Sequence, residues 1–322
     1  MCIEETINQI SDGEDIYIPE DIPILFDGAV FEEPTMGLID PRTLTLEIPE
    51  DVLFSELTVP LIGINRHRIG SDGNGITTLV AFHQCLLSCK MCINPKCNKE
   101  DGIWQYMTPE QLFDYVKVDD LYFSETHGGI TFGGGEPLLY PEFINRFFEL
   151  CKERKWRIRI ETSLNAPVGN LIKILPSIDE FIVDIKDMNR QIYSAYTGVG
   201  NYAVIRNLNI LSCEEYRNKV VIRIPFIRGY NTESDIKRSV EQIRNMGFDK
   251  IDEFNYSSPS ELSRVPNSGR KICDFLKSIR QLAATKNNIS YTPTDCSYEG
   301  ECIGTCPKCE KELEFLTNHI KA

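Results

Sequence analysis

From about residue 76 onward, the hydrophobic and polar positions follow an alternating order. Short apolar or β-branched runs are separated by amphipathic stretches, which is typical of repeated βα units and a parallel sheet. Runs such as residues 181–185 suit strands that are buried on both faces. The pattern predicts six strands, at Ile76–Phe82, Gly129–Phe132, Arg157–Thr162, Phe181–Lys186, Val220–Ile227 and Lys250–Tyr256.

The stretches between these strands place their apolar residues at helical spacing. Start signals at Thr108-Pro109 and Thr232-Glu233 support two of the helices. Right-handed connection of six such units predicts an α/β fold, an open partial (β/α)6 barrel. The predicted helices are Pro109–Val118, Pro141–Lys155, Val168–Ile178, Tyr202–Tyr216, Thr232–Met246 and, after the last strand, Arg270–Lys286.

The two ends of the chain differ from the barrel. Residues 1–60 are acidic and proline-punctuated, and predict a small N-terminal appendage with its own β structure. Residues 61–290 would form the barrel, and residues 291–322 a cysteine-rich tail. Glu310–Lys321 predicts a terminal helix that packs the tail on the barrel through Leu313, Leu316 and Ile320.

Composition excludes some partners. The chain has 34 Lys+Arg against 48 Asp+Glu, a net charge of −14, and its basic residues are scattered, which argues against nucleic acid. No apolar run approaches the roughly 20 residues of a membrane span, and the acidic first residues are unlike a secretory signal. We therefore expect a cytosolic protein, in which 12 cysteines point to metal or redox chemistry.

Three cysteines follow the first predicted strand. Cys85, Cys89 and Cys92 form a CxxxCxxC motif at the carboxyl end of that strand, where sites assemble in parallel α/β folds. Three thiolates can hold a four-iron cluster and leave one iron open to a small ligand. A zinc site is the alternative, with Cys97 or His83 as the fourth donor.

A glycine-rich segment ends the second predicted strand. Gly133, Gly134 and Gly135 precede Glu136-Pro137, so the backbone there can approach a ligand closely. The segment lacks the Gly-Lys-Ser/Thr of a phosphate loop and the GxGxxG of a dinucleotide fold. A carboxylate beside free carbonyls suits a cationic amine instead.

Together these motifs resemble those of radical S-adenosylmethionine (SAM) enzymes, specifically the glycyl radical enzyme activating enzymes of the pyruvate formate-lyase type. The resemblance runs from about Leu61 to Tyr256. It is carried by the cysteine motif and by the segments Gly129–Pro137, Glu161-Thr162, Asp184–Asn189, Tyr196–Asn201 and Ile222–Pro225.

The resemblance implies roles for single residues. Cys85, Cys89 and Cys92 would bind a 4Fe-4S cluster, and SAM would bind its open iron. Gly134, Gly135 and Glu136 would bind the methionyl amine of SAM, and Lys186 and Arg223 would lie near its carboxylate. Glu161, Thr162 and Asp184 would help to order the cofactor, together with a monovalent cation. No catalytic residue is expected beyond the cluster and cofactor, and a simple ion pair at the strand end is the alternative for Asp184 and Lys186.

The resemblance also implies a reaction. Reductive cleavage of SAM would produce a 5'-deoxyadenosyl radical that removes a glycine α-hydrogen from a partner enzyme, with a flavodoxin- or ferredoxin-type reductant. A maturase of a ribosomally made peptide is the alternative, and a non-catalytic iron-sulfur or zinc protein is the alternative of another class. After the last strand the family often has a histidine, whereas this chain has Asn255–Pro259, which leaves contacts there open.

The tail carries four further cysteines, at C-x5-C-x3-C-x2-C spacing. Four sulfurs with no open position predict an auxiliary 4Fe-4S cluster or a structural zinc, and the companion chemistry favours the cluster. These residues are Cys296, Cys302, Cys306 and Cys309. Cys151 and Cys273 fall on apolar helix faces and are expected to be buried structural thiols, while Cys2, Cys97 and Cys213 are left unassigned.

Overall fold

The computed structural model describes residues 57–255, 268–293 and 306–320. All of them belong to the second of two compact units, Leu57–Ala322. The predicted appendage lies almost wholly outside the described residues, as do Cys296 and Cys302, so the predictions made for them remain predictions.

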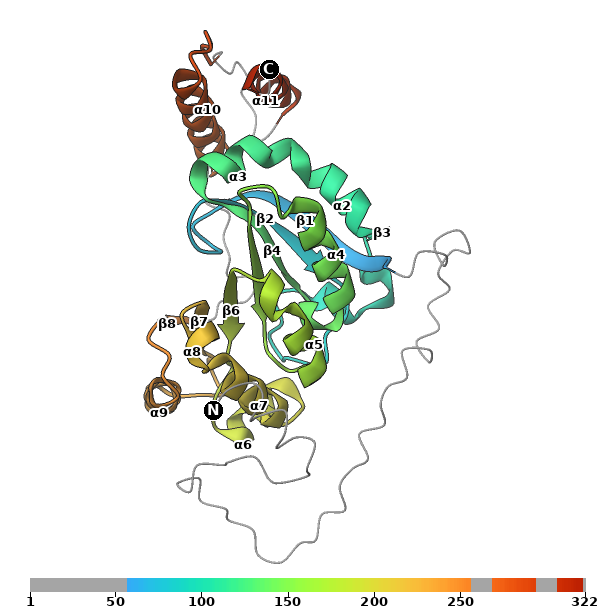
Figure 1. Cartoon of the computed structure of the whole chain (residues 1–322). Coiled ribbons are helices and arrows are strands. Elements are labelled where there is room, and N and C mark those ends of the chain that lie inside the picture. The colour runs from blue at the N-terminus through green and yellow to red at the C-terminus, as the bar shows by residue number, and fades with distance from the viewer. Residues whose placement is uncertain (1–56, 256–267, 294–305, 321–322) are drawn as a thin grey trace, which may run out of the picture. The chain divides into compact units, whose positions relative to one another are not determined.

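The core of the fold is one eight-stranded sheet with the order β3-β1-β2-β4-β5-β6-β7-β8 (Figure 1). From β2 to β8 every neighbouring pair is parallel and follows chain order, which is the open barrel predicted from the pattern. All six predicted strands form. The strands are β1 Val59–Ile69, β2 Ile76–Phe82, β3 Gln105–Met107, β4 Gly129–Gly134, β5 Arg157–Thr162, β6 Glu180–Asp184, β7 Val220–Phe226 and β8 Ile251–Asn255.

Strands β1 and β3 were not predicted. β1 pairs antiparallel with both β2 and β3, and its register shifts between Asn65 and Arg68. Its middle carries Arg66, His67 and Arg68, so the apolar alternation that marks a half-buried strand is interrupted there. The predicted domain boundary at residue 60 falls inside this strand.

Helices cover the parallel strands as expected, with corrections at their ends. Thr108 and Thr232 cap their helices through reciprocal hydrogen bonds with Gln111 and Asp235. The predicted helix 202–216 is two helices that break at Cys213, and α3 and α6 were not predicted. The helices are α2 Pro109–Val116, α3 Asp120–Thr126, α4 Pro141–Cys151, α5 Val168–Ile174, α6 Arg190–Thr197, α7 Tyr202–Leu211, α8 Glu214–Arg217, α9 Glu233–Asn245, α10 Ser268–Lys286 and α11 Pro307–Ile320, and the 3-10 turns are η2 Pro95–Asn98, η3 Glu100–Gly102, η4 Lys117–Asp119, η5 Pro137–Leu139 and η6 Leu175–Ser177.

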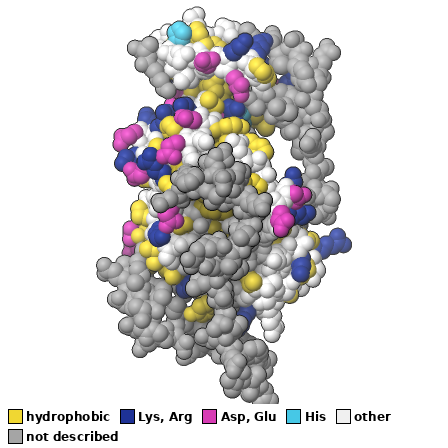
Figure 2. Space-filling model, turned by 90° about the vertical axis from the view of Figure 1, so that its right-hand side faces the viewer, with side chains coloured by type: hydrophobic (Ala, Val, Ile, Leu, Met, Phe, Trp, Pro, Cys, Tyr) yellow, Lys and Arg dark blue, Asp and Glu magenta, His cyan; other side chains and the backbone are white. Residues whose placement is uncertain are grey.

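Charged side chains of both signs share the surface. On the face shown in Figure 2, Lys and Arg side chains lie among Asp and Glu side chains. Exposed ion pairs such as Arg146 with Glu110 and Lys173 with Glu142 join neighbouring helices, and each contributes little to stability. None of the described helices is long and apolar enough to cross a membrane.

Aromatic packing holds the carboxyl ends of β2 and β4 against α4. The Phe82 and Phe132 rings stack with centroids 5.6 Å apart, and Phe132 meets Phe147 of α4 edge-on at 5.4 Å. All three side chains are fully buried. Because Phe82 is the last residue of β2, this packing places the start of the cysteine loop.

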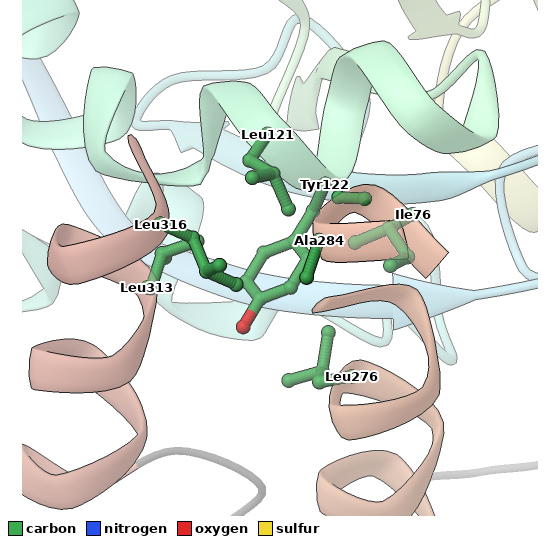
Figure 3. Packing of buried hydrophobic residues seen from close by; sticks show 8 residues of the cluster. Ile76, Leu121, Tyr122, Leu276, Ala284, Leu313 and Leu316 are labelled. Atoms are coloured by element: carbon green, nitrogen blue, oxygen red, sulfur yellow. The ribbon is translucent and has the colours of Figure 1, made fainter. Parts of the chain in front are cut away.

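A second apolar cluster packs α10 and the tail helix α11 on the barrel (Figure 3). Leu276 of α10 and Leu316 of α11 pack with Tyr122 of α3 and with Ile76, the first residue of β2. The predicted terminal helix therefore forms and packs as expected through Leu313 and Leu316, whereas Ile320 is 36% exposed. Because Ile76 is the first residue of β2, α10 and α11 pack near the amino end of that strand.

A buried ion network ties β1 to the turn η4. Asp119 accepts hydrogen bonds from Arg66 Nε at 2.8 Å, from Arg66 Nη2 at 2.9 Å and from His67 Nε2 at 2.9 Å. Burial raises the pKa of the Asp119 carboxyl, but the hydrogen bonds from Arg66 and His67 outweigh it, so the pKa is lowered overall. Arg66 also donates to Glu310 of α11 at 3.1 Å, so the network reaches the tail.

Replacing Asp119 with asparagine should destabilise the protein by about 3 kcal/mol at pH 7, because Arg66 loses its buried counter-charge and, among the described residues, keeps only the exposed Glu310. A carboxyl whose folded pKa is lowered stabilises above its unfolded pKa of about 4, and that contribution is lost as pH falls through the lower folded value. The difference in free energy of unfolding between wild type and Asp119→Asn should therefore become smaller towards pH 3 or below.

Urea unfolding at pH 7 and at about pH 3 measures this difference in free energy of unfolding. Asp114→Asn is the matched control, because Asp114 makes an exposed pair with Lys117. Equal stability of Asp119→Asn and wild type at pH 7 would show that the network is not stabilising.

Candidate functional site

The three cysteines of the motif lie on the loop that follows β2. Gly134 pairs with Phe82 in register, so the glycine-rich end of β4 lies beside the start of this loop. Cys85, Cys89 and Cys92 are all partly exposed. The structure thus brings together at one sheet edge the two motifs that the sequence predicted to be neighbours.

Backbone hydrogen bonds donated to α6 fix the loop around Cys89. The Ser88 N–H donates to the Thr197 carbonyl at 2.8 Å, and the Lys90 N–H donates to the Tyr196 carbonyl at 3.1 Å. The last carbonyls of a helix have no partner within the helix, so the cysteine loop satisfies them. Sequence analysis missed α6 as an element, although it had singled out Tyr196–Asn201 through the family resemblance.

The glycines are needed for contact with the cysteine loop. The Gly135 N–H donates to the Phe82 carbonyl at 2.9 Å, and the Glu136 N–H donates to the Gln84 carbonyl at 2.7 Å. A Cβ on Gly135 would lie 2.0 Å from the Gln84 oxygen, and one on Gly134 would lie 2.7 Å from Ala81 Cα. No side chain fits at Gly135 while the loop keeps its place, or at Gly134 while the end of β2 keeps its place.

Glu136 is fully buried and fully hydrogen-bonded. Its Oε1 accepts from Thr162 Oγ1 at 2.6 Å and from Leu138 N at 3.2 Å. Its Oε2 accepts from the Ser163 hydroxyl at 2.6 Å and from Ser163 N at 3.0 Å. Burial raises the pKa of Glu136 against these bonds.

A carboxylate offers about four acceptor positions, and these donors fill them. In this arrangement Glu136 therefore joins the ends of β4 and β5, and a role at a cofactor amine remains a prediction. Thr162 and Ser163 both donate their hydroxyls to Glu136, and Ser163 was not predicted from the sequence. The sequence feature that could have indicated it is a second hydroxyl residue directly after Thr162 at a strand end.

Lys186 supplies positive charge beside the cysteines. Its Nζ lies 2.6 Å from Asp184 Oδ2, and its side chain is 9% exposed. Burial raises the pKa of the Cys89 thiol to about 11, and the charge of Lys186 opposes that rise. A hydrogen bond with Cys97 lowers the pKa of Cys92 to about 6, and Lys186 acts in the same direction.

Cys97, unassigned from the sequence, is thus placed beside Cys92 and is 3% exposed. Burial raises the pKa of Cys85 to about 12, and Glu136 adds to the rise. His83 has its Nε2 on the Lys99 carbonyl at 2.8 Å. Within residues 57–255, 268–293 and 306–320, no three His, Cys, Asp or Glu side chains converge closely enough to enclose a metal ion.

The buried polar atoms near the loop that have no hydrogen-bond partner among the described residues include Asp184 Oδ1 and the Tyr193 hydroxyl. Tyr193 lies on α6 and is 1% exposed. Burial raises its pKa, and the charges of Cys89 and Glu136 add to the rise. Three thiols, a neighbouring cation and unpaired buried polar atoms fit a bound cluster and a polar cofactor.

Glu161 and Arg223 contact each other, and Arg223 also contacts the turn before β2. Arg223 Nη1 donates to Glu161 Oε1 at 2.9 Å, and its Nη2 donates to the Ser71 carbonyl in the turn before β2. Burial raises the pKa of Glu161, and Asp72 adds to the rise. The cofactor roles implied for both residues remain predictions.

Of the four tail cysteines, Cys306 and Cys309 belong to the described residues. Their sulfurs lie 3.6 Å apart, and Cys309 Sγ lies 3.8 Å from Cys273 Sγ on α10. Cys151 and Cys273 are buried as expected, at 3% and 2% exposure. The proximity of Cys273 to Cys309 was not expected from the sequence.

The fold and site together define a class: open α/β barrels with three cysteines on a loop at the carboxyl edge of the sheet. Residues 79–248, more than half of the chain, match the Radical SAM superfamily model. The chain belongs to the radical SAM superfamily.

Curated relatives are activating enzymes. The chain is 28% identical over 225 residues to the (2S)-3-sulfopropanediol dehydratase activating enzyme of Klebsiella oxytoca, covering 65% of this chain and 69% of that protein. It is 34% identical over 176 residues to the pyruvate formate-lyase-activating enzyme of Clostridium pasteurianum, covering 54% and 71%. The match to the 4-hydroxyphenylacetate decarboxylase activating enzyme of Clostridioides difficile (strain CD196), 33% identical over 159 residues, covers 47% of this chain and about half, 46%, of that protein.

Solved structures are more distant. Streptococcus suis SuiB is 15% identical with a TM-score of 0.44, covering 67% of this chain and 48% of SuiB. Native anSMEcpe with bound AdoMet and a peptide is 18% identical with a TM-score of 0.42, covering 64% of this chain and 58% of that chain. At this similarity neither bears on the substrate.

Proposed function

We propose that this chain activates a glycyl radical enzyme by removing the α-hydrogen of a glycine in that partner. The observation that carries the proposal is the three-cysteine loop, held by α6 and pressed against the glycine-rich end of β4 beside Lys186. Bound together, a 4Fe-4S cluster and SAM would supply the reducing electron and the group that abstracts the hydrogen.

The chain's own residues would bind and orient these groups. Cys85, Cys89 and Cys92 would hold the cluster as thiolates, and the positive charge of Lys186 favours the anionic form of Cys89 and Cys92. Asp184 Oδ1 and the Tyr193 hydroxyl are buried without hydrogen-bond partners in the described parts of the chain, so they are available to SAM or to a monovalent cation. Glu136 would act by keeping the glycine segment in place.

The surface around the cysteine loop supports a macromolecular substrate. Leu86 and Ile93, on the loop itself, are 42% and 51% exposed. Trp104, in the segment that follows, is 49% exposed. Large apolar side chains at the rim of a site favour contact with a protein segment over a small polar metabolite.

The proposal is tested with the full chain, its cluster reconstituted without oxygen, reduced, and mixed with SAM and a candidate partner. Pyruvate formate-lyase, 4-hydroxyphenylacetate decarboxylase and sulfopropanediol dehydratase are the first partners to try, because the curated relatives are named as their activating enzymes. We expect 5'-deoxyadenosine and a glycyl radical signal in electron paramagnetic resonance with one such class of partner.

A partner whose radical-bearing glycine is replaced by alanine is the control, and it should give no such signal. Formation of 5'-deoxyadenosine with a stable mass change in a short precursor peptide, and no glycyl radical in any partner, would favour the peptide maturase. No 5'-deoxyadenosine from protein with a fully loaded cluster would instead favour a non-catalytic iron-sulfur or zinc protein.

A further inference from the structure

Two cysteines that are far apart in the sequence lie close together between α10 and α11. Cys273 of α10 and Cys309 of α11 are 36 positions apart, and their sulfurs are 3.8 Å apart. Cys306, at the start of α11, lies 3.6 Å from the same Cys309 sulfur. Cys273 and Cys309 are both buried, at 2% and 8% exposure.

These separations match the edges of a tetrahedron around one ion. With zinc-sulfur bonds of about 2.3 Å, two thiolates on one tetrahedral zinc stand about 3.8 Å apart. In a four-iron cluster each cysteine binds a different iron, so its sulfurs stand further apart around the inorganic core. The two distances at Cys309 therefore favour a single ion over the auxiliary cluster that the companion chemistry had favoured.

The position of the three sulfurs also favours a structural ion. Glu310, next to Cys309, pairs with Arg66, which lies opposite the amino-terminal half of β2. Cys85 follows the other end of that strand, and a seven-residue strand spans roughly 20 Å. An ion here lies away from the sheet edge where the cysteine triad sits, so it would hold helices together and take no part in the reaction.

The three cysteines lie beside a buried interface between α10 and α11. Leu276 of α10 and Leu313 of α11 belong to the apolar cluster in Figure 3. Arg280, fully buried on α10, donates to Glu312 of α11 at 2.9 Å, and its positive charge also acts on Cys309. A cation beside Cys309 helps to offset the negative charge of a zinc-thiolate site.

We propose that Cys273, Cys306 and Cys309 are three ligands of one zinc ion that fastens α10 to α11. The two printed sulfur separations already match a tetrahedral edge, but the three described side chains do not enclose a position for a metal ion. Binding therefore requires a side-chain movement that brings all three sulfurs around one point. The proposal makes Cys273 a ligand, where its sequence pattern had indicated only a buried thiol. It does not depend on the proposed enzymatic function.

The test uses the full chain with Cys85, Cys89 and Cys92 replaced by serine, so that metal bound at the triad does not contribute. We expect about one zinc per chain in this background, and markedly less after Cys273→Ser. Cys151→Ser is the matched control, because Cys151 is equally buried on α4 and has no cysteine partner among the described contacts. Cobalt substitution adds a readout that a packing role would not move: at equal cobalt occupancy, Cys273→Ser should weaken the sulfur-to-cobalt charge-transfer band.

A second measurement leaves Cys273 in place, in case Cys273→Ser does not fold. In the same background with Cys296→Ser and Cys302→Ser added, zinc X-ray absorption should count three sulfur neighbours if Cys273 is a ligand and two if it is not. Two sulfurs, an unchanged cobalt spectrum in Cys273→Ser, a disulfide between Cys273 and Cys309, or iron and sulfide in place of zinc would each overturn the proposal.

Discussion

Replacing Cys89 with alanine should abolish 5'-deoxyadenosine formation by the reduced, reconstituted protein. Cys89 is the middle thiol of the triad, and the hydrogen bonds of Ser88 and Lys90 to α6 hold it in position. Loss of an outer-sphere partner of a metal site typically costs up to about 100-fold, and loss of a direct ligand should cost more. Product analysis by chromatography, together with iron content per chain, measures both consequences.

Cys151→Ala is the control for this prediction. Cys151 is a buried thiol on α4, so its loss should lower stability through a small cavity and leave the activity of the folded protein unchanged. A Cys89→Ala protein that still forms 5'-deoxyadenosine at the wild-type rate would contradict the assignment of the triad to the cluster.

Replacing Gly135 with alanine should destabilise the fold by about 3 kcal/mol and lower SAM affinity as well. The new Cβ would lie 2.0 Å from the backbone oxygen of Gln84, so either the cysteine loop or the end of β4 must move. Because the next residue, Cys85, is one of the triad, that movement also displaces a predicted cluster ligand. Urea unfolding and SAM binding to the reconstituted protein measure the two effects.

Gly169→Ala is the matched control. Gly169 lies in α5, and a Cβ there would meet no atom within 4 Å. Alanine is favoured over glycine in a helix by up to about 1 kcal/mol, so this variant should be equal to or more stable than wild type. If both variants behave alike, the close contact between the glycine segment and the cysteine loop is not what makes Gly135 necessary.

Local pattern was sufficient for much of the barrel. Strands β2 and β5 begin and end where the pattern placed them. β2 is a continuous apolar or β-branched run and β5 has isoleucine at alternate positions, and both are signals that a short window reveals. The caps at Thr108 and Thr232 were predicted for a similar reason, since a capping box spans only four residues. The cysteine triad and the glycine segment are equally local signals.

Contacts between distant residues account for what the pattern missed. β1 carries charged residues at its centre, and they become intelligible only beside Asp119, which is 53 positions from Arg66. Arg223 was assigned to a cofactor through resemblance, yet its guanidinium reaches the carbonyl of Ser71, 152 positions away. Three of the four donors to Glu136 likewise come from Thr162 and Ser163, at the end of another strand and 26 and 27 positions away.

The sequence by itself therefore determined the order of the βα units, the cysteine loop after β2 and the glycine-rich end of β4, because each depends on residues that are neighbours in the chain. Only the tertiary structure decided that α6 clamps the cysteine loop, that Glu136 is bound by Thr162 and Ser163, and that Cys273 meets Cys309. Hydrogen bonds and metal-ligand distances act over a few ångströms, so which distant residues they join depends on how the helices and strands pack.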